Sequence, residues 1–217
     1  MRIKAKIIIL LILAVSCSFC CGCGKKIPAN EIPMYGDIPK TPYQKEVDEK
    51  YIKSATELCG SREAAAKENI DGAWYYYKQG DSKTAMKRFN QSWLLDPNNA
   101  KVYFGFGVLM ADQRQHDKAI DMYNRAIELD PNYADAYHNR ALEYSKKGNY
   151  KQAIPDFSKA IENKPDRAQG YNDRACAYAE VKEYDKSWTD VHKAEESGYK
   201  VHPDFLRKLK AASGRQN

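Results

Sequence analysis

Hydrophobic and polar residues follow a helical period over most of this 217-residue chain. Between Ala134 and Pro165, apolar or aromatic residues return every three or four positions in two successive segments, with Gly148 between them. This spacing puts the apolar side chains on one face of a helix, so each segment is predicted to be an amphipathic helix. Because glycine tolerates the left-handed conformation in which many helices end, Gly148 is predicted to end the first helix of the pair.

The helix pair is repeated along the chain. Pro97, Pro131 and Pro165 lie 34 residues apart, and each closes a similar phrase. Self-similarity at such a period indicates a solenoid of helix pairs rather than the core of a globular enzyme. The pattern divides the chain into four blocks, which are residues 66–99, 100–133, 134–167 and 168–201.

These blocks carry the consensus of a known repeat family. The second block has Tyr103, Phe106, Gly107, Met110, Ala119, Tyr123, Ala126 and Pro131 in the consensus positions, and the third block matches equally well. The chain therefore resembles the tetratricopeptide repeat family. The resemblance implies an all-α fold, a right-handed superhelical solenoid of four helix hairpins with capping helices at both ends. The first and fourth blocks match more loosely, as expected of terminal repeats that pack on one side only.

Helices are also predicted on both sides of the repeats. Residues 43–60 form an N-terminal capping helix, since Thr41, Pro42 and Gln44 make a capping-box start. Its apolar stripe is predicted to cover the first repeat and consists of Val47, Tyr51, Ala55 and Leu58. The repeat domain spans residues 61–217, and a C-terminal cap helix is predicted over 203–212.

The N-terminal 16 residues have a different character. A basic start precedes an unbroken apolar run from Ile7 to Val15, which is typical of a signal peptide and short for a membrane span. The sequence from Ala14 to Cys17 resembles the lipobox of bacterial lipoproteins, which implies a diacylglyceryl group on Cys17. Attachment at Cys23, or an uncleaved anchor, remains an alternative.

Residues 17–42 would then connect the lipid to the repeats. Their prolines predict an extended, semi-rigid tether. The resemblance to lipoproteins implies a location in a bacterial cell envelope, on the periplasmic or extracytoplasmic face. Ser18 stands where an Asp retains some lipoproteins in the inner membrane, which favours the outer membrane.

Charge and composition argue against several function classes. The formal net charge is +6; without Arg2, Lys4 and Lys6 it is +3 (32 basic against 29 acidic residues), too mild and too mixed for a nucleic-acid surface. The cysteines near the N-terminus lack a second ligand pair for zinc. No grouping of nucleophile and base stands out, so we predict no cofactor, no metal and no enzyme activity.

What remains is a binding surface. In the family, the first helix of each repeat lines a concave groove that holds a peptide or a partner helix. The resemblance maps this groove onto Trp74, Tyr77, Lys101, Phe104, Val108, His138, Leu142 and Asn172. The predicted function is a membrane-anchored scaffold that binds protein partners during assembly of an envelope complex. The alternative is a structural homo-oligomer that self-associates through its capping helices.

Overall fold

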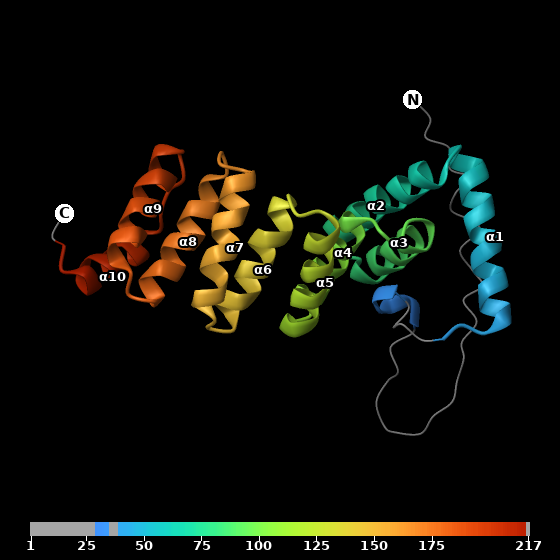
Figure 1. Ribbon diagram of the computed structural model, residues 1–217, viewed down its shortest axis with the longest axis horizontal. Helices are drawn as coiled ribbons and strands as arrows, with labels where there is room; N and C mark the ends of the chain where they lie inside the picture. The colour runs from blue at the N-terminus through green and yellow to red at the C-terminus, as the bar shows by residue number, and fades with distance from the viewer. Residues whose placement is uncertain (1–28, 35–38, 216–217) are drawn as a thin grey trace, which may run out of the picture.

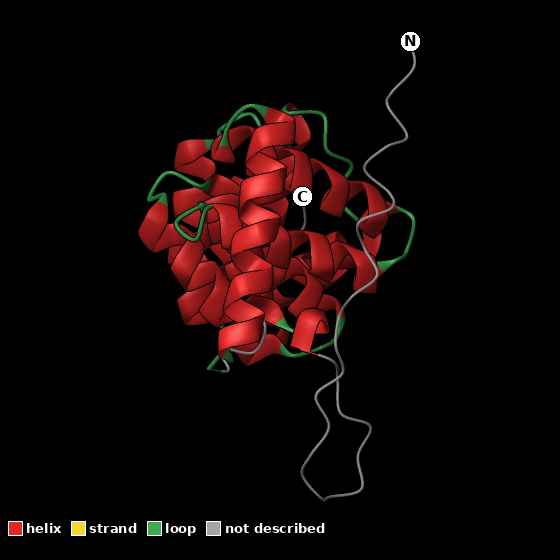
Figure 2. Ribbon diagram, turned by 90° about the vertical axis from the view of Figure 1, so that its right-hand side faces the viewer, coloured by secondary structure: helices red, strands yellow, loops and turns green. Residues whose placement is uncertain are grey.

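The computed structural model describes residues 29–34 and 39–215, and this part of the chain is all helical. Eight of its helices form four antiparallel hairpins that lie side by side along the long axis of the molecule (Figure 1). Short loops connect them (Figure 2). The hairpins are α2 (Arg62–Lys78) with α3 (Ser82–Leu95), α4 (Ala100–Asp112) with α5 (His116–Leu129), α6 (Ala134–Lys146) with α7 (Tyr150–Asn163), and α8 (Ala168–Glu180) with α9 (Tyr184–Glu196). The predicted solenoid of four hairpins is therefore confirmed.

The turns inside the hairpins share one backbone geometry. Gly80, Arg114, Gly148 and Lys182 lie 34 residues apart, and all four have a positive φ. Gly148 ends the α6 turn at φ +75°, as the sequence predicts. Arg114 and Lys182 adopt the same left-handed conformation, at φ +58° and +63°, although their side chains make it less favourable than it is for glycine.

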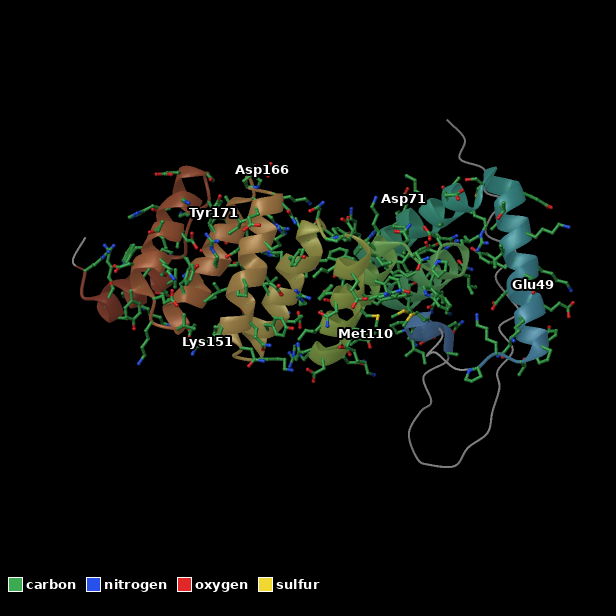
Figure 3. The ribbon with its side chains drawn as sticks, viewed as in Figure 1. Glu49, Asp71, Met110, Lys151, Asp166 and Tyr171 are labelled. Carbon is green, nitrogen blue, oxygen red and sulfur yellow. The ribbon has the colours of Figure 1, made fainter. Side chains whose placement is uncertain are left out.

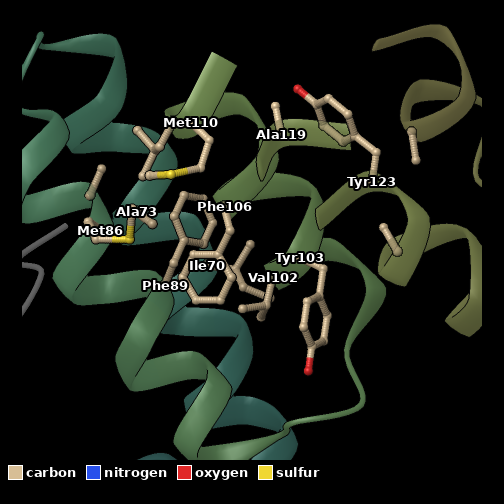
Figure 4. Close-up of a cluster of buried hydrophobic side chains, with 14 residues drawn as sticks. Ile70, Ala73, Met86, Phe89, Val102, Tyr103, Phe106, Met110, Ala119 and Tyr123 are labelled. Atoms are coloured by element: carbon tan, nitrogen blue, oxygen red, sulfur yellow. The ribbon is translucent and has the colours of Figure 1, made fainter. Parts of the chain in front are cut away.

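The largest hydrophobic cluster lies between α2, α3, α4 and α5 (Figure 4). Phe89 and Phe106 are fully buried there, with ring centroids 6.0 Å apart. Two glycines of α4 let neighbouring rings approach its backbone. A Cβ on Gly105 would lie 2.3 Å from the Phe89 ring, and one on Gly107 would lie 2.4 Å from Tyr123.

Helix α1 (Pro42–Cys59) begins with the predicted capping box between Thr41 and Gln44. The predicted apolar stripe is corrected in part. Val47 and Leu58 are 40% and 66% exposed, whereas Tyr51 and Ala55 do pack on the first repeat. The contacting face also includes Ile52 and Cys59, since a hydrogen bond of 2.9 Å from Asn69 Nδ2 to the Tyr51 hydroxyl turns that side inward.

The C-terminal helix α10 (Pro203–Ser213) packs against α9 and buries Leu209. Trp188 Nε1 donates to the Ser213 hydroxyl at 3.1 Å. None of the helices within residues 29–34 and 39–215 is long and apolar enough to cross a membrane. The predicted signal peptide and Cys17 lie outside the described residues.

The predicted tether over residues 17–42 also needs a correction. Residues 29–34, which we call the strap, do not stand away from the repeats. They include the 3-10 turn η2 (Ala29–Glu31) and lie against α3. The reason is local: the buried side chain of Asn90 on α3 hydrogen-bonds to backbone carbonyl groups of the strap.

Candidate protein-binding face

A line of aromatic rings runs across the first helices of the first two repeats and reaches the start of α6. Trp74 contacts Tyr77 with a centroid distance of 5.6 Å, and it contacts Phe104 of the next repeat at 5.8 Å. Phe104 in turn lies 5.1 Å from Tyr133, which immediately precedes α6. We call these four residues the aromatic strip. All four side chains are half-buried, so each has both a packed side and an accessible one.

The packed side of the aromatic strip rests on the hydrophobic core. The Trp74 ring lies 5.2 Å from Phe89, and the Phe104 ring lies 5.9 Å from Tyr123. Such contacts hold the rings in place before any partner arrives. A surface of fixed rings loses little side-chain freedom on binding, which favours affinity.

The hydroxyl groups at the ends of the aromatic strip stay protonated at neutral pH. Burial and a hydrogen bond to Asp112 raise the pKa of Tyr77 to about 12. Burial also raises the pKa of Tyr133, and the nearby carboxylates of Asp135 and Asp130 add to the shift. Both phenols are therefore neutral and add no charge of their own.

Other residues of the predicted groove lie on the same first helices. Lys101 is exposed one turn before Phe104, and Val108 is half-buried against the core. Leu142 on α6 is half-buried as well. Asn172 on α8 donates to the carboxylate of Asp173 at 3.2 Å. The aromatic strip is thus confined to the first half of the solenoid, and polar groups follow it.

The prediction for His138 is corrected by its burial. Its side chain is 1% exposed and packs on the Phe157 ring at 5.5 Å, so the imidazole is out of a partner's reach. Nε2 lies 3.3 Å from the carboxylate of Asp173 on the next repeat. Burial, together with the charge of Arg167, lowers the pKa of His138 to about 4, so the ring is neutral at pH 7.

An ionic cluster lies directly beyond the aromatic strip. The carboxylate of Asp135, two residues after Tyr133, binds Arg167 Nη1 at 2.6 Å and Lys164 Nζ at 2.7 Å. These cations come from the end of the third repeat. The face therefore changes from rings to paired charges at the boundary between the second and third repeats.

Two open hollows in the described part of the chain lie elsewhere. One of about 460 Å³ is formed by residues 148–152 and 180–182, at the turns of the third and fourth hairpins. The other, of about 140 Å³, lies around Arg174 and Tyr178. Within residues 29–34 and 39–215, no group of His, Cys, Asp or Glu side chains is placed to hold a metal ion.

Tyr133 is the residue of this face that the sequence mapping missed. It lies at the last position of its repeat, just before the first helix, whereas the mapping took only positions inside helices. Its place two residues after Pro131, directly before a new block, was a usable signal.

The arrangement of stacked hairpins defines a helical-repeat solenoid. Family comparisons give its type: a model described as "Tetratricopeptide repeat" matches residues 134–167, and another described as "TPR repeat" matches residues 111–148. The first match coincides with the predicted third block. Residues 111–167 of the chain therefore carry tetratricopeptide repeats.

Solved structures share this fold at low sequence identity. A "Crystal structure of MamA" is 24% identical with a TM-score of 0.57, covering 74% of this chain and 96% of that one. "MamA 41-end from Desulfovibrio magneticus RS-1" is 19% identical with a TM-score of 0.55, covering 61% and 75%. A Thermobaculum terrenum O-GlcNAc transferase mutant is 20% identical with a TM-score of 0.51, covering 54% and only 22%. No curated protein matches the chain in sequence.

Proposed function

We propose that this protein is a lipid-anchored scaffold that captures a protein partner on its aromatic strip and holds it near a bacterial membrane. The observation that carries the proposal is the strip itself. Four half-buried rings form one continuous line across two repeats, from Tyr77 to Tyr133. Fixed aromatic side chains dominate the energetics of many protein interfaces.

The chemistry of the strip suggests what the partner presents. Rings in a line fit a helix with apolar residues at successive turns, or an extended segment with apolar residues at alternate positions. The exposed ammonium group of Lys101 beside Phe104 favours an acidic group near the apolar anchor. Side chains ending in nitrogen and in oxygen project from helices along the whole stack (Figure 3).

The lipid anchor explains how such a scaffold would act. An acyl group on Cys17 would confine the protein to the membrane surface, so a captured partner would gain a high local concentration there. A scaffold of this kind needs no catalytic residue. Mass analysis of the mature N-terminus checks the anchor, and an unmodified Cys17 would contradict it.

The strip is tested by removing its two central rings. We expect Trp74→Ala and Phe104→Ala each to reduce capture of the native partner by at least tenfold in pull-down from cell envelopes. Tyr75→Ala is the matched control, because Tyr75 lies on the same helix and is 60% exposed outside the strip. Circular dichroism of each variant separates lost binding from lost folding. Unchanged capture by both folded strip variants would reject the proposal.

Self-association is the second candidate, and one observation favours it. Tyr43, Val47 and Leu58 are exposed apolar side chains on one face of α1, the helix at the end of the stack. A second copy could cover this face. We expect Leu58→Glu to turn an oligomer into a monomer in sedimentation experiments on the full chain in detergent. A wild-type protein that is already monomeric would remove this candidate.

A further inference from the structure

A polar residue recurs at one position on the second helix of the hairpins. Asn90, Asn124 and Ser158 lie 34 residues apart on α3, α5 and α7. In the second and third hairpins this residue accepts a hydrogen bond from an arginine of the following repeat. Arg140 Nη1 donates to Asn124 Oδ1 at 2.7 Å, and Arg174 Nη1 donates to Ser158 Oγ at 2.9 Å.

The first hairpin lacks that arginine. The position that holds Arg140 and Arg174 in later repeats holds Phe106 in the second repeat, and a phenyl ring offers Asn90 no polar partner. Asn90 is nevertheless 0% exposed. A buried amide without partners is costly, so its hydrogen bonds must go elsewhere.

The strap supplies the missing partners. Asn90 Nδ2 donates to the carbonyl oxygen of Ile32 at 2.9 Å and to that of Asn30 at 3.2 Å. Glu31 lies 3.4 Å from Lys83 Nζ at the start of the same helix. Met34 packs against the main hydrophobic cluster. Six consecutive residues thus use backbone, ionic and apolar contacts on the first repeat.

We propose that the strap is a fixed part of the first repeat, specified by Asn90, and that it sets how far the solenoid can stand from its membrane anchor. This inference rests on the proposed acylation of Cys17. From Cys17 to Ala29 there are 12 steps along the chain (29−17), which span at most about 40 Å. With the strap released, the 25 steps to Pro42 (42−17) span at most about 85 Å.

The strap therefore halves the reach of the anchor and keeps the N-terminal end of the stack close to the bilayer. The aromatic strip begins on the same repeat, at α2. A partner captured there is held near the membrane, while the C-terminal hairpins extend away from the anchored end.

Hydrogen exchange of the purified full chain in detergent tests the docking, with mass spectrometry of the peptide that covers residues 29–34. We expect Asn90→Ala to speed exchange in that peptide by about tenfold or more, since the hydrogen bonds to the carbonyl groups of Asn30 and Ile32 are lost. Asn124→Ala is the matched control: it removes the equivalent side chain one repeat later and should leave the strap peptide unchanged. Glu31→Lys, which places a like charge next to Lys83, should give a smaller increase.

Equal exchange of the strap peptide in the wild-type protein and Asn90→Ala would overturn the proposal, and so would an equal effect of Asn124→Ala. Neutron reflectometry of the full chain on a phosphatidylcholine bilayer then measures the reach. The protein layer should begin within about 40 Å of the headgroups in the wild type and move outward in Asn90→Ala. A layer at the same height in both would also overturn it. A protein that forms no layer would reject the lipid anchor, whereas the exchange result would still decide whether the strap is docked.

Discussion

The second repeat uses different chemistry from the third and fourth repeats at the same places in the fold. The second repeat has Phe106 and Met122 at positions where the third repeat has Arg140 and Asp156. Phe106 is fully buried among aromatic rings. Arg140 instead binds Asp156 through two hydrogen bonds of 2.7 Å. The fourth repeat repeats the ionic arrangement with Arg174 and Asp190.

The comparison shows that this fold tolerates either an apolar contact or an enclosed ion pair at one site, with different consequences for the surface. Burial would lower the pKa of Arg140, but the hydrogen bonds and charge of Asp156 outweigh it and raise the pKa. The Arg140 guanidinium group is thus charged at any relevant pH. The first and second repeats extend aromatic rings to the surface as the aromatic strip. The third and fourth repeats instead use their polar groups to bind each other.

The largest loss of stability is expected when a buried ring of the second repeat is removed. Phe106→Ala would leave a cavity between Phe89 and Tyr103, and we expect a loss of about 3–5 kcal/mol in the free energy of unfolding. Urea denaturation followed by circular dichroism measures it. A loss below about 1 kcal/mol would show that the rings do not form a tightly packed core.

Removing one partner of the ion pair in the third repeat should destabilise the fold somewhat less. Asp156→Ala leaves a half-buried guanidinium group without its partner, and we expect a loss of about 2–3 kcal/mol, reduced from the fully buried case by solvent access. The double variant Arg140→Phe with Asp156→Met installs the residue pair of the second repeat. It should recover most of the loss, as apolar replacements of ion pairs often do. A double variant as unstable as Asp156→Ala would contradict the equivalence of the two solutions.

A smaller and pH-dependent effect is expected at His138. Because its folded pKa of about 4 lies below the ordinary value of 6.5, the unfolded chain binds a proton that the folded chain does not. Stability should therefore fall as pH drops from 6.5 towards 4, by up to about 3 kcal/mol. Burial raises the pKa of Asp173, which opposes this trend above pH 3.8. Urea unfolding at several pH values measures this trend. The free energy of unfolding should depend less on pH in His138→Gln than in His192→Gln, and an identical pH dependence in both variants would contradict the role of His138.

The smallest effect concerns the turns. Arg114→Gly and Lys182→Gly place glycine where φ is positive, and we expect each to stabilise the fold by about 0.5–1 kcal/mol. Gly148→Ala is the converse control and should destabilise by a similar amount. Shifts in thermal unfolding midpoint measure all three, and a lower midpoint for both glycine variants would refute the strain at these turns.

Much of this architecture could be predicted from the sequence because the same residue pattern recurs in several repeats. The 34-residue spacing of Pro97, Pro131 and Pro165 gave the hairpins, and Gly148 gave one turn. Departures from the repeat were harder. The strap was not predicted, because the repeat pattern does not show that the buried amide of Asn90 binds it, and prolines in the segment indicated an extended tether.

The candidate face was predicted in part. Family positions located Trp74 and Phe104, but they could not tell an accessible ring from a buried imidazole. His138 occupies the position equivalent to Phe104, yet it is enclosed by Phe157 and Asp173. Which groove positions stay accessible depends on the neighbouring repeat, and a pattern within one repeat does not contain that information.

The most direct test compares the two halves in the living cell. Lys101 and Gln169 occupy equivalent positions on α4 and α8, and both are exposed. A photo-reactive amino acid is placed at one or the other, and crosslinked proteins are identified by mass spectrometry. A scaffold that binds through its aromatic strip predicts a partner crosslinked from position 101 and none, or far less of it, from position 169. Equal crosslinking from both positions, or crosslinking from position 169 alone, would contradict the account.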